Sequence, residues 1–547
     1  MKGQEFLSKY SWVGIRPYSP ARAYGRGRDH LDAGNYALAW ERIHDAARRG
    51  HVFAMAYLGR MCRRGDGRAT DYAQAHYWFE KAALFGNSWA MSNLAWLYEN
   101  GYGCKQSLEK AVQYFHKAAA ADDTWAMNKL GGFYEDGRGC EQDYKQAFDW
   151  YMCAASQEDA EAMNNVGRMY YNGWYVEQDD ERALEWYQKA AEGGDTWGMS
   201  NLAWMYEHGR GCVQNNDEQV ELSSLIAVHW YTKAAEQNHR WAMNKLGMFH
   251  ENGRHGCEQS YTLAMSWYMK AAELHDVDGL GNVGRMYENG YGVKQDYAKA
   301  VEYYRQAAEG GDAWAMGNMA IAYDRGRGVE QNINLAFEWA TRAAQAGSRW
   351  AMNRMGYYYE AGKGTKKNYH EAFVWYMKSA EKGYADAMNN IGRMYRNGWD
   401  VTENYVKAAE WYLKAAEAGD PWAMSNLGWM YEHGEGVSQD YAKAFEFNKK
   451  SADMNNPAGL NNVGRLYYLG RGVEQDYNIA YDYFIKAADG GDNDAMYALG
   501  IIFEEGRGRE ADLEQAFFYY RKAADKGNRK AQDKIKLLSA KLGNKKD

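Results

Sequence analysis

A tryptophan that stands two residues ahead of a methionine opens the same phrase seven times in this chain. The copies resemble WAMSNLAWLYENG and begin at Trp89, Trp125, Trp197, Trp241, Trp314, Trp350 and Trp422. Successive methionines, or the residues at the equivalent position, are separated by 36 residues. The two exceptions are a step of 44 from Met199 to Met243 and a step of 37 that ends at Leu280. A fixed period of this length is typical of stacked helix pairs. The sequence therefore predicts an all-α solenoid.

Length and composition agree with this architecture. A chain of 547 residues is too long for one compact core, whereas in a repeat array each unit packs only on its neighbours. Only 4 prolines interrupt the chain, which leaves nearly all of it free to be helical. The net charge of -8, with both signs interspersed, makes nucleic acid an unlikely ligand. We find no signal peptide and no apolar run of membrane-spanning length, so we expect a cytoplasmic monomer with no membrane insertion.

The repeat signal defines three parts of the chain. Residues 1–20 form a lead without repeats, residues 21–541 form a continuous solenoid of about 14 helix pairs, and residues 542–547 form a basic tail. The longer step contains eight extra residues near 215–224, and the other irregular step has one extra residue near His255. We expect both insertions to lie in loops between helices, where extra residues cost little.

Each unit contains helix start and end signals that predict two helices. A recurring glycine within the first helix, such as Gly131, predicts close approach of a partner helix. A Gly-x-Gly pair, such as Gly137 and Gly139, predicts the left-handed end of that helix. The second helix is expected to begin after an N-capping aspartate, and the candidates are Asp143, Asp296, Asp440 and Asp476.

The consensus A-x-A-M-x-N-L-G-x-M-Y-E-x-G-x-G-V-x-Q-D-Y-x-K-A-x-x-W-Y-x-K-A-A-E-x-G-D resembles the Sel-one-like repeat, a relative of the tetratricopeptide repeat. The resemblance extends over residues 33–541 and recurs more than a dozen times, which makes it highly specific. It implies a right-handed superhelix of antiparallel helix pairs whose first helices line a concave groove that binds proteins. It implies no catalytic residues.

A second, longer period of about 108 residues groups the units in threes. The units of one class carry an arginine where others carry a tryptophan. The arginines are Arg168, Arg285, Arg393 and Arg465, and the corresponding tryptophans are Trp96, Trp204 and Trp429. Three units of the arginine class also replace the leading tryptophan with Glu161, Asp278 or Asp386. Triplication of an ancestral block explains this pattern, and so does a ligand that presents the same features every three units.

The candidate binding residues are those that this pattern places on the first helices. The seven leading tryptophans are either packing between helix pairs or exposed anchors for a ligand. A ladder of asparagines including Asn165 and Asn201 is typical of helix-to-helix hydrogen bonds within the scaffold. The asparagines that precede this ladder are candidate clamps for a peptide backbone, beside basic residues; the set is Asn128, Asn164, Asn244, Asn353 and Asn389 with Lys129, Lys245 and Arg354. The arginine row either pairs with acids of adjacent repeats or recognises ligand carboxylates.

Catalytic and metal chemistry find no support in the sequence. The 13 histidines show no ligand spacing, and the cysteines at Cys104, Cys140, Cys212 and Cys257 occur once per repeat, too far apart for a disulfide or a metal site. We therefore expect no enzyme and no cofactor. The favoured function is a scaffold that binds a protein or extended peptide, in the context of a toxin-neutralising immunity protein or an adaptor. Glycan binding on tryptophan platforms is the alternative, and single-stranded RNA is a weaker one because the chain is acidic.

Overall fold

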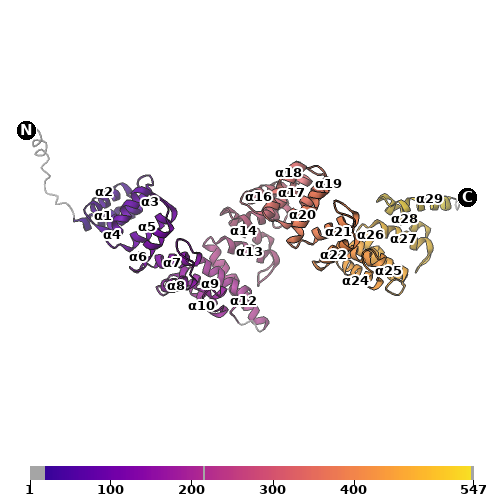
Figure 1. The fold of residues 1–547 in the computed structure, drawn as a ribbon, viewed down its shortest axis with the longest axis horizontal. Coiled ribbons are helices and arrows are strands. Elements are labelled where there is room, and N and C mark those ends of the chain that lie inside the picture. Colours follow the sequence, from indigo (N-terminus) through magenta and orange to yellow (C-terminus); the bar gives the residue numbers. More distant parts are fainter. Residues whose placement is uncertain (1–18, 213–215, 544–547) are drawn as a thin grey trace, which may run out of the picture. The chain divides into compact units, whose positions relative to one another are not determined.

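The computed structural model describes residues 19–212 and 216–543, and all regular elements in these residues are α-helices. The helices occur in pairs, each pair made of a first helix and a second helix that pack side by side (Figure 1). The chain divides into two compact units, Met1–Leu274 and His275–Asp547. We describe each unit by itself.

The described residues of unit 1 form seven helix pairs. Its first helices are α1 (Pro20–Asp32), α3 (Val52–Arg64), α5 (Ser88–Asn100), α7 (Thr124–Asp136), α9 (Ala160–Asn172), α11 (Thr196–Glu207) and α13 (Arg240–Asn252). Its second helices are α2 (Tyr36–Arg48), α4 (Tyr72–Leu84), α6 (Leu108–Ala119), α8 (Tyr144–Ala155), α10 (Asp180–Glu192), α12 (Asp217–Glu236) and α14 (Tyr261–Glu273).

In unit 2, residues 275–543 form seven more pairs and one further helix. Its first helices are α15 (Val277–Asn289), α17 (Ala313–Arg325), α19 (Arg349–Ala361), α21 (Ala385–Asn397), α23 (Pro421–His433), α25 (Pro457–Leu469) and α27 (Asn493–Glu505). Its second helices are α16 (Tyr297–Glu309), α18 (Ile333–Gln345), α20 (Tyr369–Glu381), α22 (Tyr405–Glu417), α24 (Tyr441–Asp453), α26 (Tyr477–Asp489) and α28 (Leu513–Asp525), followed by α29 (Arg529–Gly543). The all-α solenoid predicted from the 36-residue period is confirmed.

The recurring glycine of the first helix is where the second helix comes closest. A Cβ atom on Gly131 would lie 2.3 Å from Cε1 of Tyr151, which is the large aromatic residue of α8. The Tyr151 side chain is 2% exposed, so its ring fills the core of the pair. The predicted close approach at this glycine is confirmed.

The predicted helix ends are confirmed as well. The four aspartates predicted as N-caps each accept a hydrogen bond from a backbone N–H in the first turn of α8, α16, α24 or α26. Gly137 and Gly139 both have positive φ, at 67° and 70°. A side chain at Gly139 would collide with the backbone of Leu108, because a Cβ there would lie 2.5 Å from the carbonyl carbon of that residue.

One predicted insertion is a loop and the other is not. The extra residue near His255 lies between α13 and α14, and His255 itself takes a positive φ of 56°. The prediction of a loop near 215–224 is wrong for most of its length. The extra residues extend α12 to 20 residues, against 13 in most of the other helices. The reason is local: Asn216 caps the helix at the backbone N–H of Gln219, and the sequence DEQVEL that follows favours helix.

The ends of the repeat array differ slightly from the sequence prediction. Helix α1 supplies a first helix for α2, so the array begins with a complete pair at Pro20. The predicted lead lies outside the described residues up to position 18. Helix α29 continues to Gly543, two residues into the predicted basic tail, and residues 544–547 lie outside the described part. Among the described helices, none is both long and apolar enough to cross a membrane.

The Gly131 contact gives a direct test of the packing. We expect Gly131→Ala to destabilise α7 and α8 by about 1–3 kcal/mol, because the added methyl overpacks the Tyr151 ring. Gly132→Ala is the matched control, since a Cβ there would lie 3.6 Å from the nearest neighbouring atom, the Tyr151 hydroxyl oxygen. The control should be neutral or stabilising by about 0.5–1 kcal/mol. Hydrogen exchange of α7 and α8 amides measures both, and equal effects would contradict the proposed packing.

Candidate functional site

One stripe of the first helices carries nearly all of the residues singled out in the sequence. In α11 the stripe comprises Trp197, Asn201, Trp204 and His208, which are spaced at helical intervals and therefore share one face. We call this stripe, at the equivalent positions of every first helix, the first-helix face. The Trp204 ring stacks on His208 at a centroid distance of 4.3 Å.

None of the seven leading tryptophans is buried. The most accessible are Trp125 (38% exposed), Trp197 (59%), Trp314 (48%) and Trp422 (53%). The remaining three, Trp89, Trp241 and Trp350, are half-buried. Of the two interpretations made from the sequence, simple core packing does not describe the four exposed rings.

The exposed rings are nevertheless held in place. Trp125 meets Phe115 of the preceding second helix edge to face, at a centroid distance of 5.6 Å, and Trp314 meets Tyr304 in the same way at 5.5 Å. The Trp314 ring also lies over Gly281 of α15, where a Cβ would be 3.4 Å from it. Each indole is therefore supported on one side by its own scaffold, which lowers the entropy lost when a ligand covers the other side.

The secondary tryptophans of the stripe are half-buried and already have partners. Arg63 lies over Trp96, with its guanidinium carbon 5.0 Å from the ring centroid. His433 stacks on Trp429 at 3.8 Å, and Arg465 lies 4.9 Å from the same ring.

Two lysines that the sequence predicts to contact a ligand instead contact side chains of this chain. Lys129 lies over the Trp125 ring, 5.6 Å from its centroid, and Lys245 lies 5.3 Å from that of Trp241. Lys245 also donates to Glu207 of the preceding repeat at 2.9 Å. In these repeats the chain itself supplies a cation for the tryptophan.

The arginine row forms ion pairs with the repeat before it. Arg168 binds Glu135 at 2.6 Å, and Arg393 binds Glu360 at 2.7 Å, in each case across 33 residues of sequence. The prediction that these guanidinium groups recognise ligand carboxylates is corrected, because carboxylates of the chain already pair with their terminal nitrogens. The alternative that they pair with acids of adjacent repeats is confirmed at these positions.

Two further basic residues also bind side chains of this chain. Arg354 forms an ion pair with Asp324 of the preceding repeat. Arg285 donates to Asn282 of its own helix at 3.4 Å.

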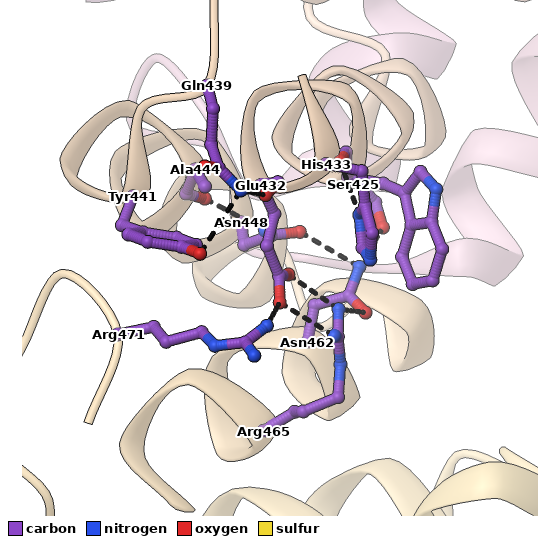
Figure 2. Close-up of polar contacts among 11 residues, drawn as sticks. Ser425, Glu432, His433, Gln439, Tyr441, Ala444, Asn448, Asn462, Arg465 and Arg471 are labelled. Atoms are coloured by element: carbon purple, nitrogen blue, oxygen red, sulfur yellow. Dashed lines mark hydrogen bonds and ion pairs between the residues drawn. The ribbon is translucent and has the colours of Figure 1, made fainter. Parts of the chain in front are cut away.

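The most deeply buried carboxylate of these ion pairs is that of Glu432 in α23 (Figure 2). Its side chain is 0% exposed and accepts from Arg465 at 2.6 and 2.7 Å and from Arg471 at 3.2 Å. We call the set of side chains that bind such a buried glutamate its cage. In other repeats a buried tyrosine of the second helix belongs to the cage, as Tyr151 does by donating a hydrogen bond from its hydroxyl to Glu135 at 2.9 Å. Sequence reasoning missed these glutamates, although the repeated Tyr-Glu pair of the phrase marks their position.

The two asparagine series bond to each other. The donor is the asparagine of one repeat and the acceptor is that of the repeat before it, at 2.8–3.0 Å; the pairs are Asn165 with Asn128, Asn201 with Asn164, Asn390 with Asn353, and Asn426 with Asn389. The scaffold role predicted for the first of these series is confirmed. The clamp role predicted for the second is corrected: Asn128 is 3% exposed and Asn164 8%, Asn353 and Asn389 are half-buried with their carbonyl oxygens engaged, and Asn244 is half-buried.

A groove of about 570 Å³ opens on the first-helix face of unit 2, over α23, α25 and α27. Its apolar wall includes Trp429, Tyr468, Tyr497 and Ile501, and Lys530 lies at its edge. Sequence reasoning missed the last four residues, because these units depart from the tryptophan pattern.

A larger open hollow of about 1400 Å³ lies between the second helices α2 and α4. Its charges are partly paired, since Arg49 binds Asp45 at 3.1 Å and Arg68 lies over Trp40 at 4.3 Å. It does not belong to the first-helix face.

Acidic residues gather beside the N-termini of several first helices. Burial is the main cause that raises the pKa of Asp195 to about 6, and the nearby carboxylates of Glu161 and Asp159 contribute to the rise. The pKa of Asp420 is raised by burial and by Asp386. These groups carry their charge at a cost in stability.

The comparisons with known proteins agree with this architecture. The family model described as the Sel1 repeat matches thirteen stretches, at residues 52–86, 90–123, 126–159, 160–195, 198–239, 242–276, 278–312, 315–348, 351–384, 385–420, 423–456, 457–492 and 493–528. The chain belongs to the Sel1 repeat family. This confirms the resemblance drawn from the consensus. A search of curated proteins gave no match.

The matched solved structures include two that share 30% identity with this chain, and the first of them supports the same conclusion. A protective antigen of uropathogenic Escherichia coli strains that displays an SLR fold is 30% identical, covering 85% of this chain and 93% of that one with a TM-score of 0.57. A Sel1 repeat protein from Oxalobacter formigenes is also 30% identical, covering 45% of this chain and 99% of its own, with a TM-score of 0.43. An immunity protein of Pseudomonas aeruginosa is 17% identical over 41% of this Sel1 repeat chain and 81% of its own, with a TM-score of 0.30.

The cage around Glu432 predicts that the loss of one arginine strongly lowers the stability of the adjoining helices. We expect Arg465→Met to destabilise α23 and α25 by about 2–3 kcal/mol, because the buried carboxylate keeps Arg471 as its only basic partner. Lys450→Met is the control, since its pair with Glu446 is exposed and worth about 0–1 kcal/mol. Hydrogen exchange of the α23 amides reports the difference, and similar protection in both variants would contradict the cage.

The raised pKa of Asp195 predicts how stability depends on pH. The unfolded carboxyl ionises near 3.8 and the folded one near 6, so the free energy of unfolding falls as pH rises between these values. Asp195→Asn keeps the N-cap and should stabilise α11 by about 1–2 kcal/mol at pH 7.5. The gain should vanish below pH 4.

Hydrogen exchange of α11 amides in both proteins at each pH tests this. Asp143→Asn serves as control, because hydrogen bonds from Gln146 lower the pKa of Asp143 and its replacement should bring no gain at pH 7.5. A gain at Asp195 that is constant from pH 4 to 7.5 would refute the assignment.

Proposed function

We propose that this protein is a non-catalytic scaffold that binds an extended segment of a partner protein along the first-helix face. The observation that carries the proposal is the set of accessible, pre-positioned indole rings, which are led by Trp197 in unit 1 and by Trp314 and Trp422 in unit 2. Tryptophan is strongly enriched among residues that dominate protein-binding energy. A repeated exposed tryptophan on a rigid helix is otherwise an unfavourable use of apolar surface.

The groove on unit 2 supports the same function. It combines the aromatic side chains of Trp429, Tyr468 and Tyr497 with polar edges, which is the composition typical of peptide-binding surfaces. Its length runs across successive first helices, as an extended segment requires. We propose a toxin that the protein neutralises, or a component that it recruits as an adaptor, as the biological partner.

Glycan binding is the second candidate, because exposed tryptophans beside carboxylates also suit stacking on sugar rings. Trp197 with Glu161 nearby is the observation that favours it. A glycan ligand would change tryptophan emission when oligosaccharides are titrated, whereas a peptide-binding scaffold would not respond to them.

A displayed library of random 16-residue peptides tests the protein-binding proposal on the full chain. Peptides selected on the wild type should lose at least tenfold in affinity for the variant Trp197→Ala/Trp314→Ala/Trp422→Ala, because each truncation removes an anchor. Fluorescence polarisation measures the affinities.

The control removes exposed side chains of similar kind from second helices. The variant Tyr77→Ala/Leu413→Ala/Phe518→Ala carries such changes on α4, α22 and α28 and should bind the selected peptides like the wild type. Selected peptides that bind the tryptophan variant unchanged, or fail on the control variant, would refute the first-helix face as the binding surface.

A further inference from the structure

Three of the exposed tryptophans each follow a repeat whose own first helix carries an acid at the equivalent position. Trp197 follows the repeat that carries Glu161, Trp314 the repeat with Asp278, and Trp422 the repeat with Asp386. All three acids are exposed. This pairing of an acid in one repeat with a tryptophan in the next is what the 108-residue period produces.

The structure brings the paired residues together. The Trp314 ring lies against Gly281, one helical turn beyond Asp278 on α15, so ring and carboxylate border the same surface. In the other two pairs the capping aspartates, Asp195 and Asp420, lie two residues before the tryptophan and feel the charge of the acid of the preceding repeat.

None of these surfaces has a lysine or arginine of its own in the described part of the chain. Trp197 does meet His239 edge to face at a centroid distance of 4.6 Å, but burial lowers the pKa of that imidazole, which favours its neutral form. Within the described residues, no lysine or arginine forms an ion pair with Glu161, Asp278 or Asp386, and none lies over the face of the three tryptophans. Near Asp386, Arg349 lies 6.0 Å from the ring centroid of Tyr384, whose hydroxyl donates to Asp386.

Other repeats show what fills such a surface. Lys129 covers Trp125 and Lys245 covers Trp241, each from four residues further along the same helix. At that position the helices of the three exposed tryptophans carry asparagine, namely Asn201, Asn318 and Asn426. The scaffold therefore completes a cation–aromatic contact in one class of repeat and leaves it open, with an added carboxylate, in another.

We propose that these three tryptophan–carboxylate pairs bind lysine or arginine side chains of the partner segment. This inference rests on the proposed protein-binding function and specifies its ligand as a basic peptide. The cation would lie on the indole face and bond to the carboxylate of the preceding repeat. The net charge of -8 favours the same ligand.

The repeat also sets a spacing for the ligand. Trp314 and Trp422 lie three repeats apart within unit 2, and neighbouring first helices pack at about 8–10 Å, which gives roughly 25–30 Å between the two sites. An extended peptide rises about 3.3 Å per residue, so its basic side chains should be about eight or nine residues apart.

Fluorescein-labelled 16-residue glycine-serine peptides with two arginines test the inference on the full chain. With the arginines nine positions apart, we expect the dissociation constant to be at least tenfold lower than for the same peptide with citrulline, the uncharged isostere. A spacing of four should bind at least threefold more weakly than nine. Equal binding of the arginine and citrulline peptides would overturn the proposal.

Paired variants separate a specific site from general electrostatics. Asp278→Asn/Asp386→Asn should remove the arginine preference, whereas Asp296→Asn/Asp440→Asn, with the same change in net charge on second-helix N-caps, should keep it. Equal losses in both variants would overturn the inference.

The peptides selected from the random library distinguish the preference for basic side chains from the protein-binding function itself. Selected peptides that depend on the tryptophans but contain no enriched basic residues, and bind Asp278→Asn/Asp386→Asn unchanged, would overturn this inference and leave the protein-binding function standing. A library that yields no tryptophan-dependent peptide would overturn the protein-binding function itself.

Discussion

A single buried carboxylate in each of several repeats ties the helix pairs together. Glu135 accepts a hydrogen bond from Tyr151, whose ring packs on Gly131 of the same pair, and an ion pair from Arg168 of the next. The same carboxylate therefore stabilises the packing within one helix pair and the attachment of that pair to the next. Since an unpaired buried carboxylate is costly, the loss of either partner weakens both levels of structure.

This arrangement decides what the first-helix face can offer to a ligand. Arg168 and Arg393 face the same side as the tryptophans, yet their charges are used to hold the array together. The asparagine ladder is used in the same way. Parts of these two arginine side chains stay exposed, but their charges are paired within the scaffold. Among the described residues, the unpaired features of the face are the supported indole rings and the acids that the 108-residue period adds, so the basic recognition suggested by the sequence gives way to an aromatic and acidic surface.

The differences between prediction and structure have physical causes. Arg168 and Glu135 are 33 residues apart, and only the stacking of one repeat on the next shows that they meet. The long α12 was mistaken for a loop because an insertion was judged by its place in the repeat pattern and not by the helix propensity of its residues. Tyr468 and Tyr497 enter the groove from units without the tryptophan phrase, so no repeat signal pointed to them.

The sequence by itself determined the helix pairs, their 36-residue period, their caps and their glycine contacts, because these depend on local backbone chemistry and repeated spacing. It also determined the 108-residue period that alternates tryptophan with acid. Only the tertiary structure decided which polar residues are satisfied within the scaffold and which aromatic rings remain open. The reason is that exposure and pairing depend on neighbouring repeats, whose side chains meet across more than thirty residues of chain.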